Sequence, residues 1–131
     1  EVTPLRAHHA FELDPVTYII AKDGKYLLFA HDTGYFPEDT WEYIENSGIR
    51  FDFVSLDCTC ILENTDLNNH HMGLNMCSRV KERLLKKNAD EKTVFCVNHF
   101  SHNGGLIYDE LVPEAEKLGF IVSYDSMEVE F

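Results

Sequence analysis

The chain has 131 residues, of which 11 are basic and 23 acidic, giving a formal charge of −12. This balance argues against nonspecific binding to nucleic acid or to an anionic membrane, because both need an excess of Lys and Arg. No stretch approaches the roughly 20 apolar residues that a membrane span needs. With 44% hydrophobic residues, the composition predicts one folded domain with a real core.

The first part of the chain predicts a β-hairpin followed by a helix. Asp23-Gly24 is a typical turn dipeptide between two strand-like runs. Pro37 suits the first turn of a helix, and Gly48 is expected to end that helix. The strand-like runs in this part are residues 2–7, 16–21 and 25–30.

The rest of the chain alternates short apolar runs with helical patterns. Residues 74–88 and 106–118 place apolar residues at helical spacing, and Pro113 indicates a late start or a kink in the second of these helices. The strand-like runs here are residues 51–56, 93–97, 120–124 and 127–131. Such alternation predicts an α/β fold with helices packed on a sheet. In these sheets, ligands bind just past the carboxyl ends of the strands.

Histidine and acidic residues follow most of the predicted strands. His70 and His71 directly precede the helix predicted from residue 74. The residues that follow strands are His8, His9, His31, Asp32, Asp57, Asn98, His99, His102 and Asp125. Several imidazoles and carboxylates on one rim would repel or desolvate one another without a cation. Neutral imidazole and carboxylate together suit Zn²⁺, Mn²⁺ or Fe, so the pattern predicts a metal site.

Asp32 also begins an Asp-Thr-Gly triplet, which is the signature of aspartic proteases. Such a protease holds two aspartates around a shared proton, so a chain with one triplet would have to dimerise. Here the triplet runs into a predicted helix, and the neighbouring helical units contradict an all-β fold. The pattern therefore favours a metal ligand over a protease acid at Asp32.

Several short motifs occur in the order found in one hydrolase family. They are PLRAHH (4–9), LLFAHDTGYF (27–36), VSLDCT (54–59), HHMG (70–73), VNHFSHNG (97–104) and YDSM (124–127). Together they resemble the C-terminal half of a metallo-β-lactamase-fold hydrolase, nearest the branch of the phosphonate-pathway cyclic phosphodiesterase and ribonuclease Z. The resemblance implies a four-layer αββα sandwich, of which residues 1–131 would form the second half.

The resemblance further implies a dinuclear enzyme that cleaves a small phosphodiester substrate. Two divalent metal ions, Zn or Mn and possibly Fe, would be the cofactors. His9 would complete the ligand set of one ion and His99 that of the other, while Asp32 would bridge them. The reaction would be hydrolysis by metal-activated water.

The resemblance also suggests roles for residues around the metals. His71 is our candidate donor of a proton to the leaving group, although capping of the following helix is an alternative. Asp57 would accept the other ring N–H of His71 and so fix its orientation. His102 and Asn103 are expected to contact the substrate phosphate, with a simple polar loop as the alternative.

One family motif has no counterpart in the chain. The H-x-H-x-D-H motif, which supplies four metal ligands, is absent from residues 1–131. We therefore expect a partial domain that binds metal weakly and turns over negligibly by itself. The missing N-terminal half, or a dimer mate, would be expected to cover the exposed sheet face.

Two other readings follow from the residues. The first is a metal-free α/β binding or assembly module that keeps the fold without the chemistry. The second is a cysteine-based zinc module, for which the candidate ligands are Cys58, Cys60, Cys77 and Cys96. Their spacing better fits reduced, buried thiols, which are typical of a cytoplasmic protein.

Overall fold

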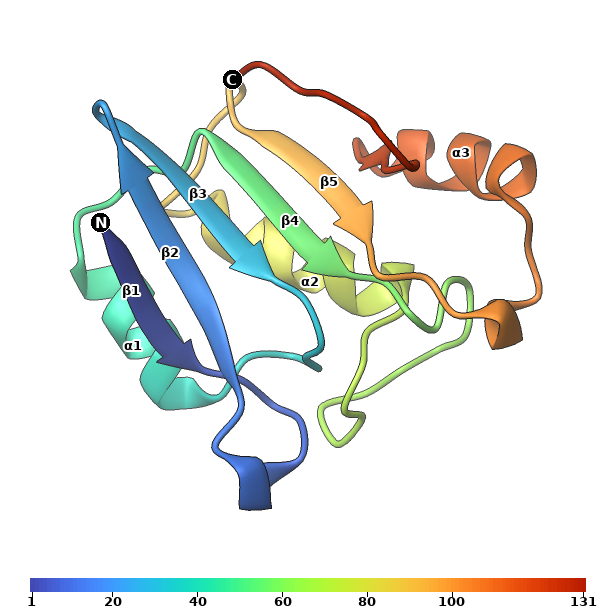
Figure 1. Ribbon diagram of the computed structural model, residues 1–131, viewed down its shortest axis with the longest axis horizontal. Helices are drawn as coiled ribbons and strands as arrows, with labels where there is room; N and C mark the ends of the chain where they lie inside the picture. Colours follow the sequence, from blue (N-terminus) through green and yellow to red (C-terminus); the bar gives the residue numbers. More distant parts are fainter.

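The computed structural model describes residues 1–131 and contains one mixed sheet of six strands with three α-helices (Figure 1). The strands are β1 (Val2–Arg6), β2 (Val16–Lys22), β3 (Lys25–Ala30), β4 (Phe53–Asp57), β5 (Val94–Asn98) and β6 (Ile121–Val122). The helices are α1 (Glu38–Asn46), α2 (Leu74–Leu84) and α3 (Tyr108–Lys117). The predicted α/β class is confirmed.

The strands lie across the sheet in chain order, which decides where their ends meet. The strands β1, β2 and β3 are antiparallel to one another, whereas β3 to β6 run parallel. The carboxyl ends of β3, β4 and β5 therefore lie at one edge of the sheet. The residues that follow these strands are brought side by side there.

The turn between β2 and β3 is built as the dipeptide predicts. Asp23 and Gly24 have φ angles of 52° and 80°, both in the left-handed region. Two-residue hairpins of type I′ need positive φ at both central residues, which Asp-Gly adopts readily. Lys22 consequently pairs with Lys25 across the hairpin.

Helices α1 and α2 cover one face of the sheet, and Figure 1 draws both behind it. Leu28 and Val54 from the strands and Trp41 from α1 are fully buried in this layer. Arg83 of α2 lies with its guanidinium carbon 4.4 Å from the Trp41 ring and forms ion pairs with Glu38 and Glu45 of α1. Planar stacking and paired charges thus join the two helices.

The other face of the sheet carries no helix. Side chains alternate along a strand, so Val16, Tyr18 and Phe29 point away from the helical layer. Their exposed fractions are 40%, 36% and 38%, which is high for apolar side chains in the middle of a sheet. Tyr18 and Phe29 are partners across β2 and β3, so the exposed apolar surface is continuous.

The C-terminal segment differs from the sequence prediction. Residues 127–131 have alternating apolar and acidic side chains but form no strand, and β6 keeps only two residues. The segment, red in Figure 1, runs back toward the start of β5. There the Phe131 ring packs 4.9 Å from that of Phe53. Contact with the sheet face has replaced the expected backbone pairing.

The ends of two helices also differ from their predictions. Helix α2 stops at Leu84 rather than at residue 88, because the buried Asn88 side chain donates to the carbonyls of Ile44 and Ile49. Helix α3 begins at Tyr108 and contains Pro113 inside it. None of the helices has the length and apolar character needed to cross a membrane.

The contact between α2 and the end of α3 gives a test of the packing. Lys81 Nζ donates to the carbonyls of Leu118 and Gly119, both at 2.8 Å, and lies 5.0 Å from the ring centres of Phe95 and Phe120. Lys81→Met keeps the aliphatic stem but removes the charged donor. We expect a loss of about 1–3 kcal/mol in the free energy of unfolding, measured with urea.

Lys92→Met is the matched control, since the Lys92 side chain is exposed. Its effect should stay within about 0.5 kcal/mol. Equal losses in the two variants would contradict a special role for Lys81.

Candidate metal site

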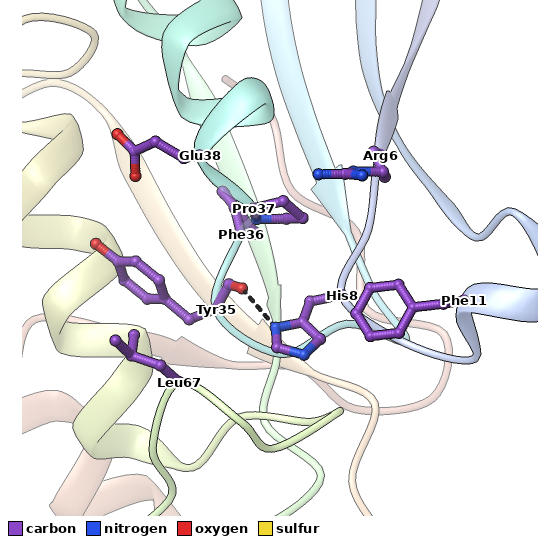
Figure 2. Close-up of a pocket in the computed structure, with 8 residues that line it drawn as sticks. All are labelled: Arg6, His8, Phe11, Tyr35, Phe36, Pro37, Glu38 and Leu67. Carbon is purple, nitrogen blue, oxygen red and sulfur yellow. Dashed lines mark hydrogen bonds between the residues drawn. The ribbon is translucent and has the colours of Figure 1, made fainter.

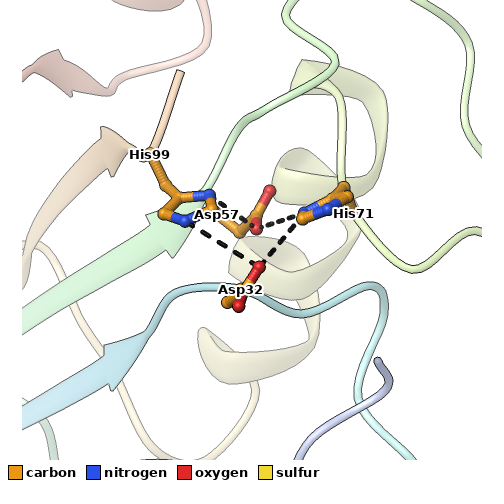
Figure 3. Close-up of side chains that lie close together, drawn as sticks. All are labelled: Asp32, Asp57, His71 and His99. Carbon is orange, nitrogen blue, oxygen red and sulfur yellow. Dashed lines mark hydrogen bonds and ion pairs between the residues drawn. The ribbon is translucent and has the colours of Figure 1, made fainter. Parts of the chain in front are cut away.

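The loops at the carboxyl edge of the sheet bring four of the predicted residues together (Figure 3). Asp32 follows β3, Asp57 ends β4 and His99 follows β5, while His71 lies on the loop before α2. One possible ligand atom from each lies within 4.8 Å of those of the other three. Residues distant in sequence thus converge on one point.

Asp57 is the buried member of this group, with no exposed surface. Its Oδ1 accepts from the backbone N–H of Thr59 at 3.0 Å and of Met72 at 3.3 Å. Its Oδ2 accepts from the Thr33 N–H at 3.2 Å and lies 2.9 Å from His71 Nδ1. A buried carboxylate needs such partners. Both of its oxygens are engaged by the chain itself, so Asp57 orients other groups.

His71 is oriented by that contact. When Nδ1–H donates to Asp57, Nε2 keeps its lone pair. His71 Nε2 lies 3.4 Å from His9 Nε2, and His9 Nε2 lies 3.3 Å from Asp32 Oδ1. Two ligand atoms about 2.0–2.1 Å from a tetrahedral Zn²⁺ are about 3.3 Å apart. The two separations match that spacing, so His9 fits beside either neighbour around an ion. The His71 nitrogen near Asp32 is Nδ1, at 3.9 Å, so only the contact with His9 involves His71 Nε2.

His99 approaches Asp32 from another side. His99 Nε2 lies 3.8 Å from Asp32 Oδ1, the same oxygen that His9 approaches. The Asp32 side chain is 59% exposed and is therefore free to meet an ion. The Asp32 carboxylate therefore lies between two imidazoles.

Asp32 and His99 have unusual backbone conformations. Asp32 and His99 have φ angles of 55° and 61°, in the left-handed region that side chains with a Cβ seldom adopt. Asp32 lies two residues after the end of β3, and His99 comes directly after β5. Four other non-glycine residues share this region, namely Asp14, Asp23, Ile61 and Ser126, so the conformation helps to place the two side chains but does not by itself mark a site.

Gly34 lets two loops of the site approach each other. A Cβ at this position would lie 1.9 Å from the carbonyl oxygen of Asn69, on the loop that carries His71. The Gly34 N–H donates to the carbonyl of His8 at 2.9 Å. The glycine of the Asp-Thr-Gly triplet therefore serves close packing beside Asp32.

The remaining predicted residues do not join the cluster. His102 and Asn103 lie on the exposed 3₁₀ turn His102–Gly104. Neither side chain makes a hydrogen bond with the residues of the cluster. Their contact with substrate stays a prediction. The sequence reasoning missed Thr33 and Thr59, whose side chains and backbone hold the site together. The only signal was their place inside the triplet and the Asp-Cys-Thr motif.

His31 lies beside the cluster on the uncovered side of the sheet. Its Nε2 lies 2.7 Å from Ser55 Oγ. Burial lowers the pKa of His31 to about 4, and the neighbouring His99 acts in the same direction against a smaller opposing effect of Asp57. The imidazole is therefore neutral at neutral pH and acts as a structural neighbour of the site.

The cysteines are free thiols and do not gather into a site. Cys58 and Cys77 are fully buried, and Cys77 Sγ donates to the Asp57 carbonyl at 3.1 Å. Burial raises the pKa of Cys77 well above its usual value and that of Cys96 to about 11. No cysteine belongs to the group of clustered ligand atoms. This arrangement gives no support to a cysteine-based zinc module.

A cavity of about 320 Å³ lies next to the cluster (Figure 2). His8, the neighbour of His9, lines it and holds its ring by a contact of 3.3 Å between Nδ1 and the Tyr35 carbonyl. Phe11 and Leu67 extend from two separate loops on its border. The exposed surface of the cavity is mostly apolar, with the charged Arg6 and Glu38 also on its border.

A comparison with models of known protein families gives no match, and a comparison with curated proteins gives none either.

The anchoring role of Asp57 can be tested by Asp57→Asn. In the variant, an NH₂ group replaces one carboxylate oxygen and faces backbone N–H groups that need an acceptor. We expect a loss of about 2–4 kcal/mol in the free energy of unfolding, because charge-assisted bonds disappear and buried donors are left unpaired. Urea denaturation measures this loss. Asp125→Asn, on an exposed side chain, is the control and should change stability by less than about 0.5 kcal/mol. If Asp57→Asn left the free energy of unfolding unchanged, the anchoring role would be refuted.

Proposed function

We propose that this chain is the second half of a dinuclear metal-dependent hydrolase of the metallo-β-lactamase fold, cleaving phosphodiester bonds with metal-activated water. The observation that carries the proposal is the position of Asp32 between His9 and His99, at 3.3 and 3.8 Å from one carboxylate oxygen. The order of the sequence motifs and the α/β topology support the same family.

The donor set fits divalent metal ions. His9, Asp32 and His99 would hold them, and His71 has a free Nε2 within the same cluster. Imidazole with carboxylate suits Zn or Mn, and also Fe. When bound, two such ions supply a nucleophilic water at neutral pH and neutralise charge on the phosphoryl oxygens.

Two residues of the chain are proposed to donate a proton to the leaving oxygen, one directly and one by orienting the donor. Asp57 accepts from His71 Nδ1 and fixes the ring with Nε2 beside His9. From this position His71 is the residue proposed to pass a proton to the departing alkoxide.

The surroundings of the cluster favour a small substrate. A net charge of −12 disfavours a long nucleic acid as the substrate. His102 and Asn103 are proposed to reach the phosphate from their exposed turn. The apolar cavity beside His8 has room for an uncharged group of the substrate.

The part of this sheet face that the C-terminal segment leaves open supports a second layer in the complete enzyme. Tyr18 and Phe29 expose apolar surface of the kind that marks an interface. We propose that a segment with the H-x-H-x-D-H motif, or a second copy of the chain, packs there. The segment with that motif would also supply the ligands that this chain lacks.

The incomplete ligand set leads to a prediction for the isolated chain. Calorimetric titration with Zn²⁺ or Mn²⁺ should show weak binding, which Asp32→Asn abolishes by removing the shared ligand. Glu128→Gln, at an exposed side chain of the C-terminal segment, is the control and should leave binding unchanged. Tight stoichiometric binding by the isolated chain would contradict the need for further ligands.

The role of His71 is tested in the complete enzyme. His71→Ala should lower the turnover of bis(p-nitrophenyl) phosphate by about 10²–10⁴-fold while bound metal stays constant. His70→Ala, at the neighbouring exposed histidine, should have a much smaller effect. Loss of metal from His71→Ala would make His71 a ligand, and failure of the complete protein to bind any metal would favour a metal-free binding module.

A further inference from the structure

The hydroxyl of Thr59 is the meeting point of three groups at the site. Thr59 lies two residues beyond the end of β4 at Asp57. Its Oγ1 donates to the His99 carbonyl at 2.7 Å. The same oxygen lies 2.9 Å from His99 Nδ1 and 3.2 Å from His71 Nδ1.

The proton count at this hydroxyl fixes the state of His99. A hydroxyl has one hydrogen and two lone pairs. The hydrogen points to the His99 carbonyl, so Oγ1 can only accept from the ring. His71 Nδ1 lies closer to Asp57 Oδ2, at 2.9 Å, and donates there. His99 Nδ1 is left to donate its N–H to Thr59, with Asp57 Oδ2 at 3.3 Å as a second acceptor.

The same hydroxyl acts on the backbone of His99. This residue has a φ of 61°, a conformation that costs free energy in a residue with a Cβ. The bond from Thr59 to its carbonyl holds that conformation. One side chain therefore contacts both the ring and the backbone of His99.

We propose that Thr59 is a positioning residue that keeps His99 in the tautomer with hydrogen on Nδ1 and so presents the lone pair of Nε2 toward Asp32. The tautomer is a property of the chain without metal. Its meaning for metal binding rests on the proposed function. Hydrogen-bond acceptors behind ligating histidines typically contribute 10- to 100-fold to metal affinity.

The first test is the tautomer of His99 in the chain without metal, read from the ¹⁵N shifts and long-range ¹H–¹⁵N couplings of the ring at a pH where it is neutral. In the wild type we expect hydrogen on Nδ1. Hydrogen predominantly on Nε2 would overturn the proposal without the need for any variant.

The second test compares three variants. Thr59→Val has the same shape but no hydroxyl and should give a mixture of tautomers at His99. Thr59→Ser keeps the hydroxyl and should restore the wild-type pattern. Thr17→Val is the matched control, because Thr17 is a buried threonine whose hydroxyl has no partner. It should leave His99 unchanged, and an unchanged tautomer in Thr59→Val would refute the proposal.

The third test separates this proposal from the function on which its meaning rests. Zn²⁺ is added while the His99 ring signals are followed. Thr59→Val should bind about 10- to 100-fold more weakly than Thr59→Ser and the wild type. A tautomer that depends on Thr59 in a protein that binds no Zn²⁺, with or without its second layer, would uphold the positioning and refute the hydrolase. Equal Zn²⁺ affinity in Thr59→Val and Thr59→Ser would refute the effect of Thr59 on the ligand.

Discussion

The buried carboxylate of Asp57 is the constraint from which the site takes its shape. An ionised group removed from water costs several kcal/mol unless charge or hydrogen bonds compensate it. Here the compensation comes from backbone N–H groups at Thr33, Thr59 and Met72 and from the ring of His71. Each donor belongs to a segment at the carboxyl edge of the sheet, so satisfying one carboxylate brings those segments into a single arrangement.

The sheet topology brings to one edge the site residues that Asp57 then orients. The strands β3, β4 and β5 are parallel neighbours in chain order. Asp32, Asp57 and His99 therefore follow one another along the same edge of the sheet. His9 arrives from the end of β1 and His71 from the start of α2, and both close the cluster from outside the parallel strands. Threonine hydroxyls and a glycine then set the fine spacing, although none of these residues has chemistry of its own to attract notice.

Features that depend on a local sequence pattern can be predicted from the sequence. Features that depend on contacts between distant residues cannot. The turn at Asp23-Gly24 and the strand-to-loop position of Asp32 follow from short-range rules. The end of α2 does not, because Asn88 bonds with carbonyls near α1. The C-terminal segment has strand-like alternation, yet Phe131 packs on the sheet face. The importance of Thr59 is likewise hidden, since its partner is 40 residues away.

The left-handed backbones of Asp32 and His99 have a consequence for evolution as well as for chemistry. Since folding already imposes these conformations, an arriving cation would meet preorganised ligands and need no rearrangement of the main chain. The same feature opposes stability, because a glycine at residue 32 would relieve the strain while deleting the carboxylate. Selection for a more robust fold alone would therefore tend to erase the site, and its persistence in a lineage would be a sign that the chemistry is in use.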